Sequence, residues 1–157
     1  MFILKPSRKK IVEVLKFLNK RLKKVKWILV GSASLMVQGV DVSPPDIDIL
    51  TNKRDIRKIE KLLEEYEIER LKYGISEFFR YCFCVFRIKG VKVEVMSNLE
   101  VKIGNRWKKS RILPKEIEFK GMKFLVSPLK GELRVRKKLR RKVDLEYIKK
   151  IEESLNK

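Results

Sequence analysis

The sequence is poor in the residues that usually bind soft metals. Its 157 residues include no histidine and two cysteines, Cys82 and Cys84. These are too few soft ligands for a zinc site. The two cysteines lie two apart in an expected strand, so they share a face and cannot easily close a relaxed disulfide; we interpret them as buried thiols. Any metal should be held by oxygen, which favours Mg²⁺ or Mn²⁺.

The sequence also lacks an apolar run near the roughly 20 residues that a membrane-spanning helix needs. The longest runs, 27–30 and 82–86, have the length of buried strands. The apolar start 1–4 precedes Lys5 and Pro6 directly, and it is too short for the core of a secretory signal. We expect no membrane partner, a cytoplasmic location and one domain over 1–157, because the chain suits a single core.

Acidic residues are scarce relative to basic ones. The 20 Asp and Glu residues stand against 40 Lys and Arg, for a formal net charge of +20. A charge-rich chain with a single Gln and a single Thr is typical of a thermophile protein. Heat adaptation does not explain why basic residues outnumber acidic ones by two to one. Surplus positive charge favours an anionic partner such as nucleic acid or a polyphosphate.

Periodicity predicts an α+β fold in which helices pack on a mixed sheet and further helices end the chain. The expected helices are one capped by Ser7 and running to about Lys24, then 32–38 and 53–66. The expected strands are 27–30, 46–50, 80–88, 91–96, 117–119 and 122–126, of which the last four form two hairpins. From Ser127 as the helix cap and Pro128 as the first helical residue, the chain should be helical, with a break near Lys142.

Three carboxylates carry the chemistry that the pattern suggests. Asp46 and Asp48 alternate along an expected strand, so both project from one face with Cα atoms roughly 6.5 Å apart, and one cation can touch both. Glu94 interrupts the apolar alternation of 91–96, and a neighbouring strand could bring it to the same ion. Each of these features alone also fits a solvated strand edge or a lysine-paired carboxylate.

Gly31 and Ser32 stand where a buried strand meets a short helix. Alone they could be a simple strand-to-helix turn. A helix start offers free backbone N–H groups and a positive dipole end to a phosphate, and the two aspartates follow within twenty residues. The combination therefore favours a phosphate-binding turn beside a metal site.

These residues resemble a known family. The segment 31–39, the Asp46–Ile49 run and the Val93–Val95 run are similar, in order, to the three-part signature of the polymerase-beta-like nucleotidyltransferases, in particular their minimal single-domain prokaryotic members. The C-terminal cluster of Lys137, Arg140, Arg141, Lys142 and Asp144 is similar to the family's last motif. Pro44 and Pro45 replace a small polar or basic residue, and Glu94 replaces a frequent aspartate.

The resemblance implies transfer of a nucleoside monophosphate from a nucleoside triphosphate to a hydroxyl of RNA, protein or a small molecule. Asp46, Asp48 and Glu94 would be catalytic and would hold two Mg²⁺ (or Mn²⁺) ions, with Glu94 nearest the acceptor. Gly31 and Ser32 would bind the triphosphate. The alternative is a catalytically silent nucleotide- or nucleic-acid-binding protein of the same fold, such as an antitoxin-like partner.

The basic run 130–142 has two interpretations. It contains eight Lys or Arg residues and one acidic residue. Either it is a solvated helix face, or Lys137 and Arg140 face the site and neutralise a triphosphate or an RNA backbone.

Overall fold

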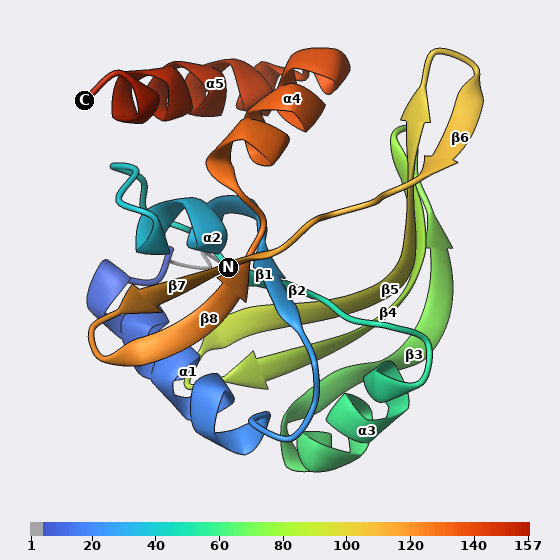
Figure 1. Ribbon diagram of the computed structural model, residues 1–157. Helices are drawn as coiled ribbons and strands as arrows, with labels where there is room; N and C mark the ends of the chain where they lie inside the picture. Colours follow the sequence, from blue (N-terminus) through green and yellow to red (C-terminus); the bar gives the residue numbers. More distant parts are fainter. Residues whose placement is uncertain (1–4) are drawn as a thin grey trace.

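One mixed sheet organises the fold, with helices on both of its sides (Figure 1). The computed structural model describes residues 5–157, so the N-terminal run 1–4 lies outside the described residues. The helices are α1 Arg8–Arg21, α2 Gly31–Val37, α3 Asp55–Leu62, the short 3₁₀ helix η1 Glu64–Tyr66, α4 Leu129–Leu139 and α5 Lys142–Leu155. Within residues 5–157, no helix is long and apolar enough to cross a membrane.

The sheet runs in the order β3-β4-β5-β2-β1-β8-β7, and β6 pairs with the far part of β5. The strands are β1 Ile28–Val30, β2 Ile47–Leu50, β3 Glu67–Ile75, β4 Phe79–Ile88, β5 Val91–Ile103, β6 Arg106–Lys109, β7 Lys115–Phe119 and β8 Met122–Val126. The central strand β2 is parallel to β5 and antiparallel to β1. The predicted mixed α+β fold and both predicted hairpins are confirmed.

Several boundaries differ from the sequence prediction for local reasons. Strand β3 was not anticipated, because its side chains are mostly exposed and show no apolar alternation; pairing with β4 makes it a strand. Ser7 caps α1 as predicted, since its Oγ accepts a hydrogen bond from the Lys10 N–H at 3.1 Å. The prediction that Ser127 caps the next helix is wrong. The Ser127 N–H donates to the Leu29 carbonyl and so continues the sheet, and the N-cap is Pro128.

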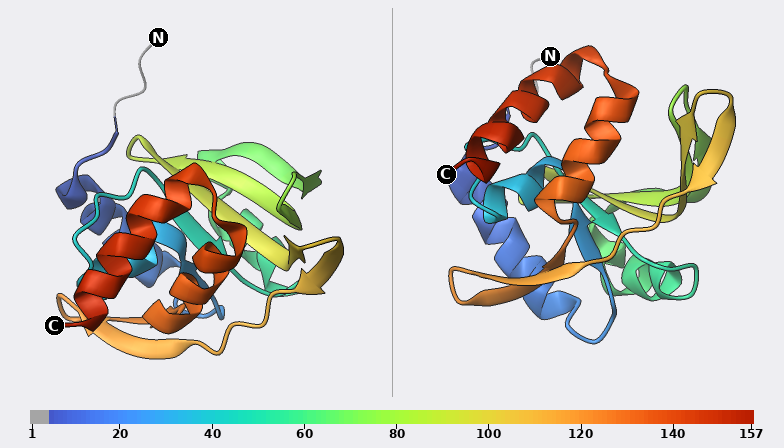
Figure 2. Two further views of the ribbon diagram at one scale, coloured as in Figure 1. Left: turned by 90° about the horizontal axis from the view of Figure 1, so that it is seen from above. Right: turned by 45° about the horizontal axis from the view of Figure 1, so that its top comes forward.

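The two sides of the sheet differ in what covers them. One side, which we call the core face, packs against α1, α2 and α3 and contains the main apolar cluster. The other side, the carboxylate face, has a small second cluster of Val30, Leu50 and Met96, with half-buried neighbours that include Tyr81 and Phe83. Helices α4 and α5 rise on this second side, as the turned views in Figure 2 show.

Candidate functional site

The carboxylate face brings the three predicted acidic residues together. Asp48 on β2 and Glu94 on β5 are directly paired in the parallel register, so their side chains project from the same side of the sheet. Asp46 lies directly before β2 and two residues before Asp48, so its position favours the same side of the sheet. The pairing explains why Glu94 breaks an apolar pattern, since its side chain points away from the core.

Burial and mutual repulsion dominate the electrostatics of this group. Burial raises the pKa of Asp48 well above its ordinary value, and the negative charges of Asp46 and Glu94 raise it further. Burial also raises the pKa of Asp46 and of Glu94, against the opposing positive charge of Lys92. Three carboxylates held this way favour binding of a cation or a proton.

Gly31 fits closely against one of these carboxylates. Its φ of +68° lies in the left-handed region, and a Cβ there would stand 2.9 Å from Oδ2 of Asp48. Only glycine meets both conditions without strain. The turn between β1 and α2 is therefore shaped around Asp48.

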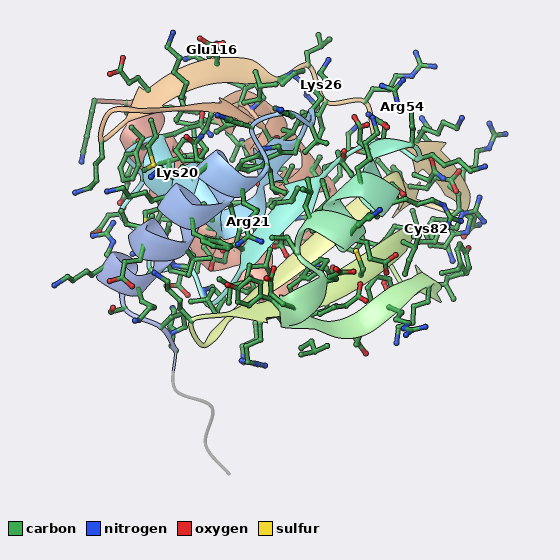
Figure 3. All side chains as sticks on the ribbon, turned by 90° about the horizontal axis from the view of Figure 1, so that it is seen from below. Lys20, Arg21, Lys26, Arg54, Cys82 and Glu116 are labelled. Carbon is green, nitrogen blue, oxygen red and sulfur yellow. The ribbon has the colours of Figure 1, made fainter. Side chains whose placement is uncertain are left out.

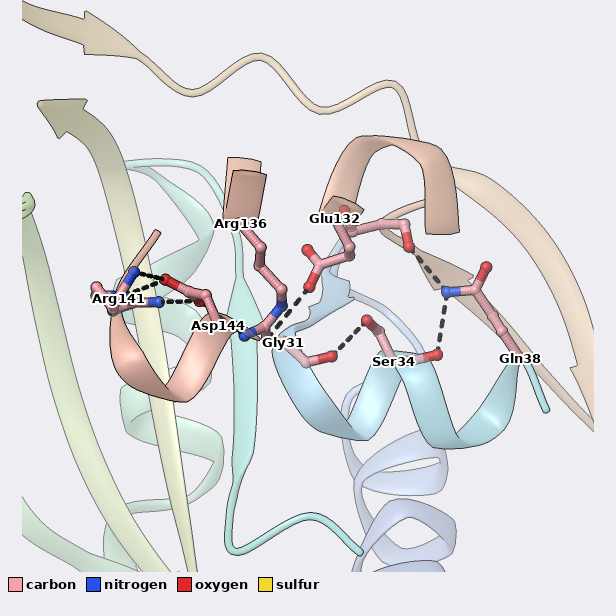
Figure 4. Close-up of polar contacts among 8 residues, drawn as sticks. Gly31, Ser34, Gln38, Glu132, Arg136, Arg141 and Asp144 are labelled. Carbon is pink, nitrogen blue, oxygen red and sulfur yellow. Dashed lines mark hydrogen bonds and ion pairs between the residues drawn. The ribbon is translucent and has the colours of Figure 1, made fainter. Parts of the chain in front are cut away.

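The surroundings of Gly31 differ from an open phosphate-binding turn (Figure 4). Ser32 is only 7% exposed. The Ser34 Oγ donates to the Gly31 carbonyl at 2.6 Å, and Gln38 bridges the carbonyls of Ser34 and Ser127. Burial raises the pKa of Glu132, while the charge of Arg136 and the backbone of Gly31 act against that rise, so an internal carboxylate lies close to this turn.

A buried charge network, absent from the sequence prediction, joins this turn to the C-terminal helices. Arg136 lies 3.9 Å from Glu132 and 3.1 Å from Asp144, whose side chain is fully buried. Arg141 completes the network with hydrogen bonds of 2.7 and 2.9 Å to Asp144. Burial alone would raise the pKa of Asp144, but the hydrogen bonds from Arg141 and the charge of Arg136 outweigh it and hold that pKa below the ordinary value.

The structure does not bring Lys137 and Arg140 to the carboxylates. Lys137 is exposed and lies 3.9 Å from Glu152 on α5. Arg140 is exposed and ends α4 in a left-handed conformation. Helical geometry gives the reason for Lys137, because neighbouring positions differ by about 100° around the axis and Arg136 takes the inward direction. Arg140 follows the last residue of α4, so its left-handed backbone and not the helix sets its direction. A role for Lys137 and Arg140 in nucleotide binding stays a prediction.

Two further side chains at the site were missed by sequence reasoning. Lys92, two residues before Glu94 on the same face, lies 3.9 Å from its carboxylate. Its position two residues from Glu94 in an alternating strand would have predicted that both side chains lie on one side of the sheet. Tyr81 on β4 faces Glu94, and burial followed by the charge of Glu94 raises the pKa of Tyr81 to about 12. The sequence did not predict that Tyr81 points toward Glu94, because this direction depends on a β-bulge in the β4–β5 pairing.

A second acidic group lies on the other side of the sheet. A carboxylate oxygen of Glu60, a carboxylate oxygen of Glu67 and the Sγ of Cys84 all lie within 4.8 Å of one another. Burial and a hydrogen bond with Glu60 raise the pKa of Glu67 to about 7. Cys84 is buried and both cysteines are free. A cavity of about 850 Å³ beside the group is lined by Glu60, Glu67 and Cys82.

The donor set at Asp46, Asp48 and Glu94 fits Mg²⁺ or Mn²⁺. All three are carboxylates, which hard divalent ions prefer. Two of them stand side by side in adjacent strands, and the missing Cβ of Gly31 leaves room against Asp48. Lys92 supplies part of the compensating charge.

Comparisons with known proteins agree with this geometry. Residues 8–129 match the family DUF6036, described as nucleotidyltransferases of unknown function. The crystal structure of a candidate nucleotidyltransferase from Thermotoga maritima is 30% identical, with 96% of each chain covered and a TM-score of 0.78. ANT(2")-Ia, solved in complex with adenylyl-2"-tobramycin, shares the fold at 11% identity, with 94% of this chain and 90% of its own covered and a TM-score of 0.60. A search of the curated proteins found no match. The predicted resemblance is confirmed, and the chain belongs to the DUF6036 family of nucleotidyltransferases.

Proposed function

We propose that the protein transfers a nucleoside monophosphate from a nucleoside triphosphate to a hydroxyl group. One observation carries the proposal: Asp48 and Glu94 are paired across two parallel strands, with Asp46 beside them. A buried carboxylate whose neighbours are also negative is poorly placed for stability alone. Membership of a nucleotidyltransferase family supports the same activity.

In this reaction the acceptor hydroxyl oxygen attacks the α-phosphorus of the triphosphate. The new oxygen–phosphorus bond forms as the bond between the α-phosphorus and the oxygen leading to the β-phosphorus breaks, and pyrophosphate leaves. Glu94 receives the hydroxyl proton at a carboxylate oxygen. Its raised pKa, which follows from burial, makes it a stronger base than an exposed glutamate.

Asp46, Asp48 and Glu94 would hold Mg²⁺ or Mn²⁺. These ions would supply charge stabilisation for the attacking and leaving oxygens. Lys92 would orient Glu94 through its ion pair. The turn at Gly31 and Ser32 would bind the triphosphate after the Glu132 carboxylate moves away from the Gly31 backbone.

A second candidate function is a catalytically silent nucleotide- or nucleic-acid-binding protein of the same fold. The closeness of the Glu132 carboxylate to the Gly31 backbone favours this alternative, because a negative group of the chain already lies beside the turn expected to bind phosphate. Asp48 remains the residue that separates the two functions, since a silent nucleic-acid binder does not need it.

Calorimetry with each nucleoside triphosphate, with and without Mg²⁺, tests the first proposal. We expect Mg²⁺ to strengthen triphosphate binding and Asp48→Asn to abolish that gain, because a neutral amide is a poorer ligand. Asp41→Asn is the matched control, since the Asp41 side chain is 89% exposed and lies 3.7 Å from Arg8. Equal binding by wild type and Asp48→Asn, with and without metal, would exclude the metal-site role.

The acceptor can be sought directly. Incubation of the protein with each labelled triphosphate, Mg²⁺ and cell extract should label one class of macromolecule. The Asp48→Asn variant should give no labelling, whereas the Asp41→Asn variant should label as wild type. Labelling that persists with Asp48→Asn would assign the transfer to a contaminant.

A further inference from the structure

An extended basic arm stands beside the carboxylate face. Residues 101–114, which we call the β6 arm, include the end of β5, all of β6 and the segment that leads to β7. The arm contains five Lys or Arg residues and no acidic residue. In Figure 1 it projects beyond the body of the protein, on the side where α4 and α5 also rise.

The arm is held rigid by contacts at its base. Arg80 makes a 2.6 Å ion pair with Glu100 and stacks over the Trp107 ring at 4.7 Å, and Lys102 lies 5.9 Å from the same ring. These contacts use the charges of Arg80 and Glu100. Arg106, Lys108 and Lys109 stay exposed, so their charges are free to meet a partner.

A second basic segment faces the base of the arm. Residues 133–143, around the α4–α5 turn, contain seven Lys or Arg residues and no acidic residue. Arg136 and Arg141 are paired with Glu132 and Asp144, which leaves five cations of this segment outside the buried network. Arg141 of this segment lies 5.1 Å from the ring of Phe79, and Phe79 pairs with Val101 at the base of the arm. Phe79 therefore lies between Arg141 and the base of the arm, at the edge of the carboxylate face.

The sheet between these segments carries half-buried apolar side chains as well as the carboxylates. Half-buried apolar and aromatic side chains surround the carboxylates there, namely Ile28, Tyr81, Phe83, Leu99 and Ile112. Such side chains suit the flat faces of bases, while the flanking cations suit a phosphate backbone. At ~3.3 Å per residue, the strand from Glu94 to Ile103 extends about 30 Å, which spans several nucleotides.

We propose that the β6 arm and the 133–143 segment bind a single-stranded nucleic acid whose terminal hydroxyl is the acceptor at the carboxylates. This inference rests on the proposed transfer activity for the role of the hydroxyl, but the binding surface rests only on the cations and the apolar side chains between them. A polyanion with bases matches both features of the face. An acidic protein would match the cations and leave the apolar part between them without a partner.

Fluorescence anisotropy with a fluorescein-labelled, unstructured 12-nucleotide RNA, without triphosphate, tests the surface. The variant R106A/K108A/K109A should bind about 10-fold more weakly at low salt. Its plot of log affinity against log salt should be flatter by about 2, because each lost phosphate contact contributes roughly 0.7 for single strands. The charge-conserving variant R106K/K108R/K109R should bind as wild type.

The matched control is K16A/K20A/K24A, which removes the same charge from exposed positions on and beside α1. These residues lie away from the carboxylate face, and Figure 3 shows Lys20 on the opposite side of the molecule. If the control loses as much affinity as the arm variant, or if the arm variant binds like wild type, the proposed surface is wrong. Equal competition by polyglutamate would also overturn it in favour of a general polyanion.

The two proposals fail separately. If the arm variant loses RNA affinity while Mg²⁺ has no effect on triphosphate binding by wild type, the surface stands and the transferase function fails. If transfer is confirmed but RNA is neither bound through the arm nor extended at its terminal hydroxyl, the acceptor assignment fails and the transferase function stands.

Discussion

The two faces of the sheet are held together by different forces. The core face buries a continuous apolar cluster, whose largest members, including Phe86 and Leu15, have no exposure. The carboxylate face has a small apolar cluster, and beside it α4 is joined to α5 by the ion pairs of Arg136, Asp144 and Arg141. Apolar packing therefore stabilises the core face, whereas buried ion pairs hold the charged groups beside the carboxylate face in place.

This contrast has a physical reason. Apolar packing is insensitive to ligands and strengthens with the area removed from water. A face that receives phosphates cannot be closed by apolar packing, because its polar groups must stay available. Networks of ion pairs fix the direction of the side chains there. Removing one partner of a buried ion pair lowers the stability of the fold strongly.

The largest expected loss of stability follows from a cavity at the core face. Phe86→Ala should lower the free energy of unfolding by about 3–5 kcal/mol, since Phe86 is fully buried. Urea unfolding measures this loss. Triphosphate binding per folded molecule should stay unchanged, which separates the faces. The control Tyr73→Ala, at a position 60% exposed, should cost less than about 0.5 kcal/mol.

Breaking the buried network should cost nearly as much as the cavity. Arg136→Ala should lower the free energy of unfolding by about 3 kcal/mol, because it leaves Glu132 without its cation while Asp144 keeps Arg141. Thermal unfolding at low and high salt provides the measurement.

The neighbouring position gives the contrast with Arg136. Lys137→Ala should cost less than about 0.5 kcal/mol, since both Lys137 and its partner Glu152 are about half exposed. Similar losses for the two variants would contradict the distinction between a buried network and a solvated helix side.

Adding a methyl group at Gly31 should have a smaller effect on stability. Gly31→Ala forces a left-handed alanine, at roughly 1–2 kcal/mol, and adds a contact with Asp48. Gly39→Ala is the matched control, because Gly39 has a φ of +91° and nothing within 4 Å of the added Cβ. Only Gly31→Ala should also weaken Mg²⁺-dependent triphosphate binding. Equal binding by both variants would mean that Gly31 does not shape the metal site.

The smallest expected effect is the pH dependence that Glu67 gives to the core face. Its folded pKa is raised to about 7, so its contribution is fully present below about pH 4.5 and is lost as pH rises through 7. Stability should therefore fall from pH 5 to pH 8 by on the order of 1 kcal/mol after solvent screening. Glu67→Gln should remove this fall, as urea titrations at several pH values can measure. Glu69→Gln, on the same strand, should keep it.

Much of the fold could be predicted because its signals are local. The Ser7 cap and the glycine turns after Lys89 and Lys120 act over a few residues, and each appears where expected. Strand β3 and the N-cap of α4 could not be predicted this way. Pairing with a distant strand decides both, through β4 for β3 and through the Leu29 carbonyl for Ser127.

The sequence by itself determined the acidic trio, the glycine at the turn and the excess of positive charge. Only the tertiary structure decided which charges meet. The β2–β5 register sets Asp48 opposite Glu94. The packing of α4 turns Arg136 inward and leaves Lys137 and Arg140 in solvent. Side chains alternate strictly along a strand, so the sequence shows that two carboxylates share one side of the sheet. In a helix rich in charged residues, the side chain that points inward depends on where its buried partners lie.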